Sequence, residues 1–128
     1  MVVDDDDDLR SMISRVLTGL GYEVLDASGG NQAAVVYAQH QPDLVIADLI
    51  MPDGEGLELI MTLRRTYKEA KIIAISGNGH GSKTNYLVMA QSLGADYTME
   101  KPFSAAQLLS MVRLAIGTGQ ASLTIAVS

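Results

Sequence analysis

Short apolar runs alternate with longer amphipathic segments along most of the chain. The short runs lie at Met1–Asp4, Glu23–Asp26, Leu44–Ala47, Ile72–Ile75 and Tyr97–Met99. Runs this short and this apolar are typical of strands that are buried on both faces of a parallel sheet. In the segments between them, apolar residues recur at steps of three and four, which is the spacing of a helix with one buried face. The pattern therefore predicts five strand–helix units.

The predicted helices have recognisable ends. Their ranges are Leu9–Leu20, Asn31–His40, Leu57–Tyr67, Asn85–Leu93 and Ala105–Ile116. Gly21 and Gly94 follow two of them as C-caps, and Ser104 precedes the last as an N-cap. Strict alternation of strands and helices predicts an α/β fold, a doubly wound, flavodoxin-like parallel sheet with strand order 2-1-3-4-5 and helices on both faces. We expect one domain over residues 1–117, and a C-terminal tail or linker remnant over 118–128.

Polar residues follow four of the predicted strands. Asp4 and Asp5 follow the first strand, Asp48 the third, Ser76 the fourth and Lys101 the fifth. In a sheet of this order, ligands bind beyond the carboxyl ends of the strands, at the topological switch point between strands 1 and 3. Three carboxylates, a hydroxyl and an ammonium group are therefore expected to converge at one edge of the sheet.

Crowded carboxylates indicate a cation, because each raises the pKa of its neighbours unless a positive charge is present. Mg²⁺ is bound by hard oxygen ligands, usually one or two carboxylates together with waters and phosphate. We expect Asp5 and Asp48 to bind the metal directly, Asp4 to act mainly through water, and the backbone carbonyl of Ile50 to complete the protein ligands. Lys101 and Ser76 would then suit a phosphoryl group on the far side.

The chain opens with five consecutive aspartates, Asp4 to Asp8. Asp4 and Asp5 are assigned to the metal site. Asp6 to Asp8 fall at the start of the first helix, where the helix dipole favours each negative charge by about 0.3–1 kcal/mol before mutual repulsion.

Several motifs in a fixed order carry a resemblance to a known family. They are VVDD at 2–5, MPDGEGLEL at 51–59 behind Asp48, SG at 76–77, GAD at 94–96 and KPF at 101–103. With these motifs, residues 1 to about 116 resemble the receiver domain of two-component response regulators, in particular the single-domain chemotaxis type. The order and spacing of the motifs are more specific than any one of them.

The resemblance implies a phosphorylation-dependent signalling switch. Asp48 would accept a phosphoryl group from a sensor histidine kinase or phosphotransfer protein, Asp4 and Asp5 would hold Mg²⁺, and Ser76 and Lys101 would contact the phosphoryl group. It also implies a cis peptide before Pro102, and a downstream protein partner on the face made by the fourth helix, fifth strand and fifth helix. The chain departs from the family pattern in that fifth strand, where Thr98 stands at the usual aromatic position.

Composition excludes several function classes. Hydrophobic residues make up 48% of the 128 residues, which indicates a globular chain, and the absence of cysteine excludes disulfides and thiolate metal sites. A net charge of −6 with one Phe and no Trp argues against direct nucleic-acid binding. No apolar run reaches the length of a membrane span, so we expect a soluble cytoplasmic protein without membrane contact.

Two other functions remain open as alternatives. A Mg²⁺-dependent phosphohydrolase with an aspartyl-phosphate intermediate would need a second aspartate two residues after the nucleophile, where this chain has Ile50. A receiver-like interaction module that works without phosphate would normally lack one of the acidic or lysine positions. Each of those positions is occupied here, so a phosphoacceptor domain, and not a turnover enzyme, is the leading interpretation.

Overall fold

The computed structural model describes residues 2–3, 7–27, 29–49, 55–76, 83–117 and 124–127. The strands are β1 (Val2–Val3), β2 (Glu23–Ala27), β3 (Val45–Asp48), β4 (Ile72–Ser76), β5 (Tyr97–Glu100) and β6 (Thr124–Val127). The helices are α1 (Asp7–Gly19), α2 (Gly30–His40), α3 (Glu55–Thr66), α4 (Lys83–Leu93) and α5 (Ala105–Ile116). The five predicted strand–helix units are therefore confirmed. None of the helices described is long and apolar enough to cross a membrane.

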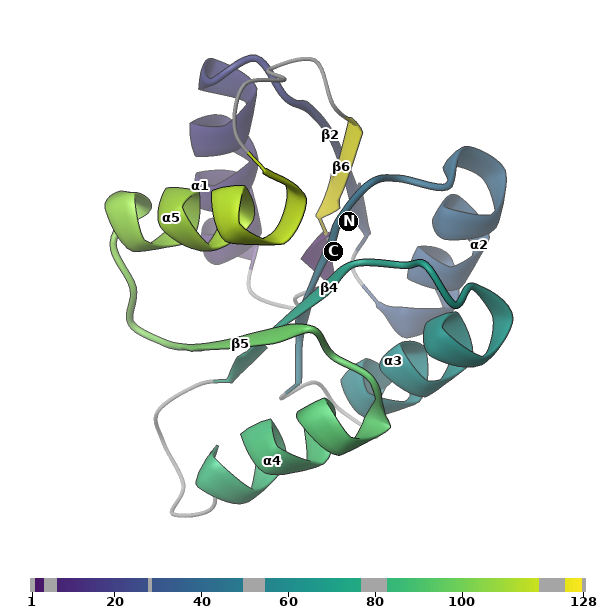
Figure 1. Cartoon of the computed structure of the whole chain (residues 1–128). Coiled ribbons are helices and arrows are strands. Elements are labelled where there is room, and N and C mark those ends of the chain that lie inside the picture. Colours follow the sequence, from purple (N-terminus) through teal and green to yellow (C-terminus); the bar gives the residue numbers. More distant parts are fainter. Residues whose placement is uncertain are drawn as a thin grey trace.

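The strands form a parallel sheet covered by helices on both faces (Figure 1). β1 pairs with both β2 and β3, β3 pairs with β4, and β4 pairs with β5. These pairings give the predicted order 2-1-3-4-5 for the first five strands, and the predicted fold class is confirmed.

A sixth strand departs from the prediction. The segment 118–128 was expected to be a loose tail, yet Thr124–Val127 forms β6, which pairs in parallel with β2 and with β3. Its sequence, TIAV, contains β-branched and small apolar residues that suit a buried strand. The predicted strands are just as short, but each is indicated by its alternation with amphipathic helical segments; residues 124–127 lie outside that alternation, so the pattern does not indicate a strand there.

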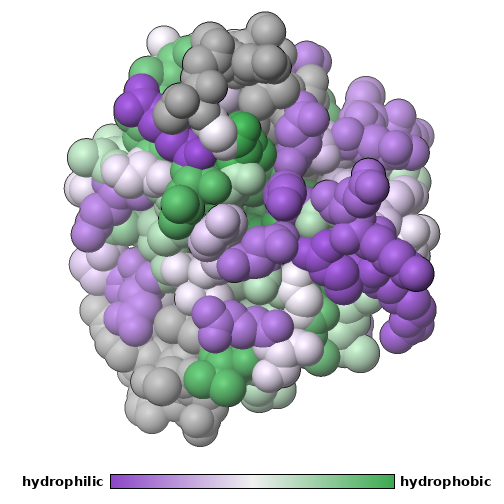
Figure 2. Space-filling model, in the orientation of Figure 1, coloured by the Kyte–Doolittle hydropathy of each residue, from purple (hydrophilic) through white to green (hydrophobic). Residues whose placement is uncertain are grey.

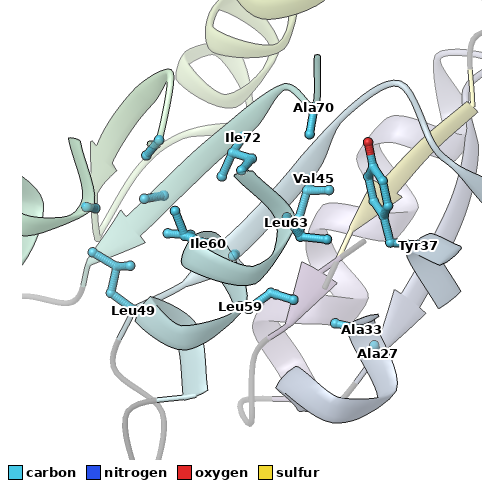
Figure 3. Close-up of a cluster of buried hydrophobic side chains, with 14 residues drawn as sticks. Ala27, Ala33, Tyr37, Val45, Leu49, Leu59, Ile60, Leu63, Ala70 and Ile72 are labelled. Carbon is cyan, nitrogen blue, oxygen red and sulfur yellow. The ribbon is translucent and has the colours of Figure 1, made fainter. Parts of the chain in front are cut away.

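Two apolar clusters hold the helices against the sheet, one on each face. The first joins α2 and α3 to β3 and β4, and Figure 3 shows Tyr37 of α2, Val45 of β3 and Leu63 of α3 among its members. The second cluster contains Ile13 and Leu17 of α1, Leu108 and Val112 of α5, and Ile46, Ile73 and Ile75 of the sheet. Neighbouring residues of one strand enter opposite clusters because side chains alternate across a strand.

An arginine joins the C-terminal half of α3 to the turn between α4 and β5. The Arg64 guanidinium donates hydrogen bonds to the carbonyl oxygen of Gly94 (2.7 and 3.1 Å) and to that of Lys68 (2.7 Å). It also pairs with Oδ2 of Asp96 at 2.8 Å, an atom that in turn accepts a bond from the backbone N–H of Ile72. The GAD motif is thus the point where the turn before β5 is fixed to α3 and β4.

We expect Arg64→Lys to lower the free energy of unfolding by about 1–2 kcal/mol, because an ammonium group cannot reach all of the acceptors that the planar guanidinium fork bonds. Urea denaturation followed by circular dichroism measures this difference. Arg65→Lys, one residue along the same helix, is the matched control and should change stability by less than about 0.5 kcal/mol. Equal stability of the two variants would contradict this role of Arg64.

Candidate functional site

Three of the predicted site residues meet at one edge of the sheet. Asp48 ends β3, Ser76 ends β4, and Lys101 directly follows β5. The Lys101 N–H donates to the carbonyl oxygen of Ser76 (2.8 Å), and the Leu49 N–H donates to that of Ile75 (2.8 Å). The backbone hydrogen bonds between neighbouring strands therefore continue one residue past the ends of β3 and β5. They fix the relative positions of Asp48, Ser76 and Lys101.

The carboxylate of Asp48 is buried beside a positive charge. Its side chain is 3% exposed, and its Oδ2 lies 3.0 Å from Nζ of Lys101, whose side chain is 22% exposed. A buried carboxylate remains charged at low cost only where a cation and hydrogen-bond donors are near it. Ser76, on the neighbouring strand, is fully buried. An anionic oxygen, an ammonium group and a hydroxyl therefore line the carboxyl end of the sheet, as the sequence predicted.

The remaining predicted ligands, Asp4, Asp5 and the Ile50 carbonyl, lie outside the described residues. The strand before the two aspartates is placed, however, and Val3 pairs with Ala47. Val3 directly precedes Asp4 and Ala47 directly precedes Asp48, so the two strands are paired up to the residue before each aspartate. Within the ranges that the structure covers, there is no cluster of three acidic or histidine side chains able to hold a metal.

The segment after Lys101 leads directly into a capped helix. The Lys101–Pro102 peptide is cis, as expected. Ser104 caps α5: its hydroxyl accepts from the Gln107 N–H (3.1 Å), and the Gln107 side chain accepts from the Ser104 N–H (2.8 Å). This reciprocal capping box confirms the predicted start of the last helix and sets where the chain leaves the site.

Gly56 has a role at the site that the sequence motif did not reveal. It lies in the first turn of α3 and is buried. A Cβ atom at this position would overlap the carbonyl oxygen of Asp48 and would lie 2.9 Å from the Cα of Leu49. The start of α3 therefore packs directly on the backbone of Asp48, the candidate phosphoacceptor. The two backbones are so close that only glycine, which has no Cβ atom, fits at position 56.

Comparison with known proteins decides the family. A model of the response regulator receiver domain matches residues 1–113. The chain belongs to this family. Among its relatives, the chemotaxis protein CheY of Bacillus subtilis is 34% identical over 113 residues, which cover 88% of this chain and 92% of CheY. The phosphate regulon transcriptional regulatory protein PhoB of Pseudomonas aeruginosa is 33% identical over the same share of this chain, but over 49% of its own length.

Solved structures agree with this assignment. The receiver domain of NtrX from Brucella abortus is 30% identical, with a TM-score of 0.83 over 92% of this chain and 98% of that domain. The beryllofluoride-activated NtrC4 receiver domain dimer is 29% identical, with a TM-score of 0.79 over 90% of this chain and 93% of that one. This chain spans about half the length of several of the curated relatives that it matches.

Membership of the family establishes the general function. This receiver domain is a phosphorylation-dependent signalling switch, and not a classical enzyme. Receiver domains are phosphorylated by histidine kinases, interact with downstream effectors and bind Mg²⁺ at the site of phosphorylation.

We expect Gly56→Ala to disturb both the fold and the site, because the added methyl group meets backbone atoms of β3 that cannot move independently of the sheet. The free energy of unfolding should fall by about 1–3 kcal/mol, as in other overpacked sites, and phosphorylation by a small phosphodonor should slow. Gly19→Ala, at a helical glycine with nothing within 4 Å of the new methyl group, is the control and should be neutral or slightly stabilising. A Gly56→Ala variant as stable as Gly19→Ala would show that α3 can withdraw from Asp48.

Proposed function

We propose that Asp48 is the phosphoacceptor of this receiver domain, and that a sensor histidine kinase or phosphotransfer protein is its donor. The observation that carries this proposal is the burial of the Asp48 carboxylate at the end of β3, 3.0 Å from the Lys101 ammonium. A carboxylate oxygen of Asp48 forms the new bond to phosphorus, while the bond between phosphorus and the donor's leaving atom breaks. In-line transfer of this kind depends on positioning and on neutralising the oxygens of the phosphoryl group.

Ser76 and Lys101 are the proposed contacts of that phosphoryl group. Lys101 has three N–H donors, so it can bond a phosphoryl oxygen on Asp48 in place of the carboxylate oxygen that it contacts now. Ser76 ends the adjacent strand, and its hydroxyl can donate to another oxygen. Both donors lie at the edge where negative charge increases during transfer, which is where they stabilise the transition state most.

Asp5, Asp48 and the Ile50 carbonyl are the proposed protein ligands of Mg²⁺, and Asp4 is proposed to act mainly through a bound water. They form a donor set of hard oxygens that leaves room for water and phosphate, which suits this ion. When bound, the ion neutralises negative charge on the phosphoryl group. The pairing of Val3 with Ala47 supports this assignment, because it brings the strand before Asp4 beside the strand that ends at Asp48.

The surface formed by α4, β5 and α5 is the proposed site for a downstream protein. Val88 and Met89 of α4 are 55% and 46% exposed, and Leu114 of α5 is 62% exposed. Figure 2 shows hydrophobic areas separated by hydrophilic side chains on the face of the molecule that carries α4 and α5. An interface that forms reversibly is about as apolar as the rest of a protein surface, so a face of this mixed composition is compatible with such a partner.

We expect Asp48→Asn to abolish labelling by acetyl phosphate and Mg²⁺, because an amide oxygen is a far weaker nucleophile than a carboxylate. Intact mass spectrometry measures the added phosphoryl group. Asp43→Asn, an exposed aspartate just before the opposite end of the same strand, is the matched control and should label at the native rate. Equal labelling of both variants would refute the assignment of Asp48. A native chain that takes no phosphate at all would favour the phosphate-independent interaction module.

Mg²⁺ should raise the melting temperature of the native chain. At about ten times its dissociation constant, a ligand that binds the folded state alone adds about 1.4 kcal/mol, which corresponds to a few degrees. We expect Asp5→Asn to lose this shift and Asp8→Asn, three residues along the same acidic run, to keep it, because Asp8 is an exposed residue of α1. Thermal unfolding with and without Mg²⁺ provides the comparison. A shift that survives in Asp5→Asn would remove Asp5 from the metal site.

A further inference from the structure

β5 is an edge strand with an open outer side. The order of strands in the sheet ends at β5, which pairs with β4 alone among the strands described. Figure 1 shows β5 at the front of the molecule, between α4 and α5. The outer side of an edge strand carries backbone N–H and C=O groups that no strand of the same sheet bonds, so it can pair with a strand of another chain.

Thr98 and Glu100 direct their backbone groups to this outer side. The Lys101 N–H donates to the Ser76 carbonyl oxygen (2.8 Å), which lies on the β4 side. Successive residues of a strand direct their N–H and C=O groups to opposite sides, so the odd-numbered residues of β5 bond toward β4 while Thr98 and Glu100 face outward. Thr98 is partly buried, and no hydrogen bond joins its backbone to a described residue beyond its own strand.

An apolar groove lies beside this edge, between β5 and α5. Its volume is about 670 Å³, and its lining includes Met99, Phe103, Met111 and Leu114. The first three of these side chains also belong to the apolar cluster that α1 and α5 share, or pack against it, whereas Leu114 is 62% exposed. Protein domains that recognise an extended peptide combine an open strand edge, which bonds the peptide backbone, with pockets for its alternate side chains.

We propose that a downstream protein docks here through an extended segment, which adds a strand to the outer edge of β5 and places an apolar side chain in the groove. The backbone of the segment bonds to the N–H and C=O of Thr98. This inference rests on the proposed function only in taking the surface of α4, β5 and α5 as the partner site. It adds the form in which the partner is bound.

The charge of this surface favours a neutral or basic segment. Glu100 is the one charged residue among the described residues that line the groove, and the whole chain has a net charge of −6. A second copy of the chain would bring two such acidic molecules together, and like charges across an interface disfavour binding. An apolar segment with a lysine or arginine beside it is therefore the complement of this edge in both hydrogen bonding and charge.

A synthetic peptide tests the docking edge directly. In the probe, leucine alternates with threonine between terminal lysines, and the control peptide has the same sequence with N-methyl groups on its central amides. NMR titration of the isotope-labelled native chain measures both affinities, with and without acetyl phosphate and Mg²⁺. We expect the probe to shift the amide signals of Thr98 and Glu100 and the methyl signals of Met111 and Leu114. The control should bind about tenfold more weakly, because it cannot donate the backbone hydrogen bonds.

Proline at position 98 removes the outward N–H from the protein itself. An edge strand tolerates proline where the N–H faces away from the sheet, so the bonds between β5 and β4 remain. We expect Thr98→Pro to weaken binding of the probe about tenfold, and Thr98→Val, which retains the N–H, to change it by less than about twofold. Circular dichroism verifies that both variants fold. If Thr98→Pro does not fold, the comparison of the two peptides decides.

The outcomes separate this inference from the proposed function. A probe that does not bind, that binds elsewhere on the chain, or that binds equally well when N-methylated would overturn docking at β5. Thr98 signals that shift with protein concentration alone would also overturn it, because the occupant would then be a second copy. A native chain that takes no phosphate on Asp48 but binds the probe at β5 would refute the phosphoacceptor assignment and leave the docking edge intact.

Discussion

The burial of one negative charge constrains the rest of this structure. Asp48 is 3% exposed, and a carboxylate in that position needs a cation and hydrogen-bond donors around it. Lys101 meets this need from a distance of 53 residues along the chain, so the pair exists only if β3, β4 and β5 are side by side and end together. The register of β3, β4 and β5 places Lys101 beside Asp48, and the capping box at Ser104 fixes where the chain continues after Lys101.

Two close contacts attach helix α3 to the strands that position Asp48 and Lys101. Gly56 allows the first turn of α3 to lie on the backbone of Asp48, and Arg64, two turns later, fixes the other half of α3 to the turn before β5. One helix is therefore attached both to the strand that carries the proposed phosphoacceptor and to the strand that precedes Lys101. A change of charge at Asp48 is therefore applied to strands that are attached to each other through α3. A switch between two discrete arrangements requires packed elements of this kind.

The sequence predicted those parts of the fold that depend on local pattern. Apolar periodicity gave the five strand–helix units, and their alternation gave the order 2-1-3-4-5, because handedness and burial leave few other arrangements. The placement of Asp48, Ser76 and Lys101 followed from the rule that the carboxyl ends of parallel strands share an edge. Three features depended on distant partners and were missed: the contact of Gly56 with Asp48, the bonds of Arg64 to Gly94, and β6. A sequence pattern carries no information on how closely two backbones approach, or on which strands a short segment after the last predicted helix will pair with.

The fifth strand shows how the route from the site to the partner surface differs from the usual family pattern. Tyr97 packs against the cluster that α1 and α5 share, and its hydroxyl donates to the Leu114 carbonyl oxygen at 3.4 Å. Thr98, one residue later, points to the other side of the strand by alternation, and its small side chain buries little area whichever way it turns. Packing at Thr98 therefore contributes little to the difference between the two states, and shifting an equilibrium from mostly off to mostly on requires about 5.5 kcal/mol. In the proposed mechanism most of that difference comes from the contacts of Ser76 and Lys101 with the phosphoryl group. The Lys101 N–H donates to the Ser76 carbonyl oxygen, so the ends of β4 and β5 are linked next to the site. In the proposed mechanism this link connects the phosphoryl contacts to β5, and through β5 to the partner surface.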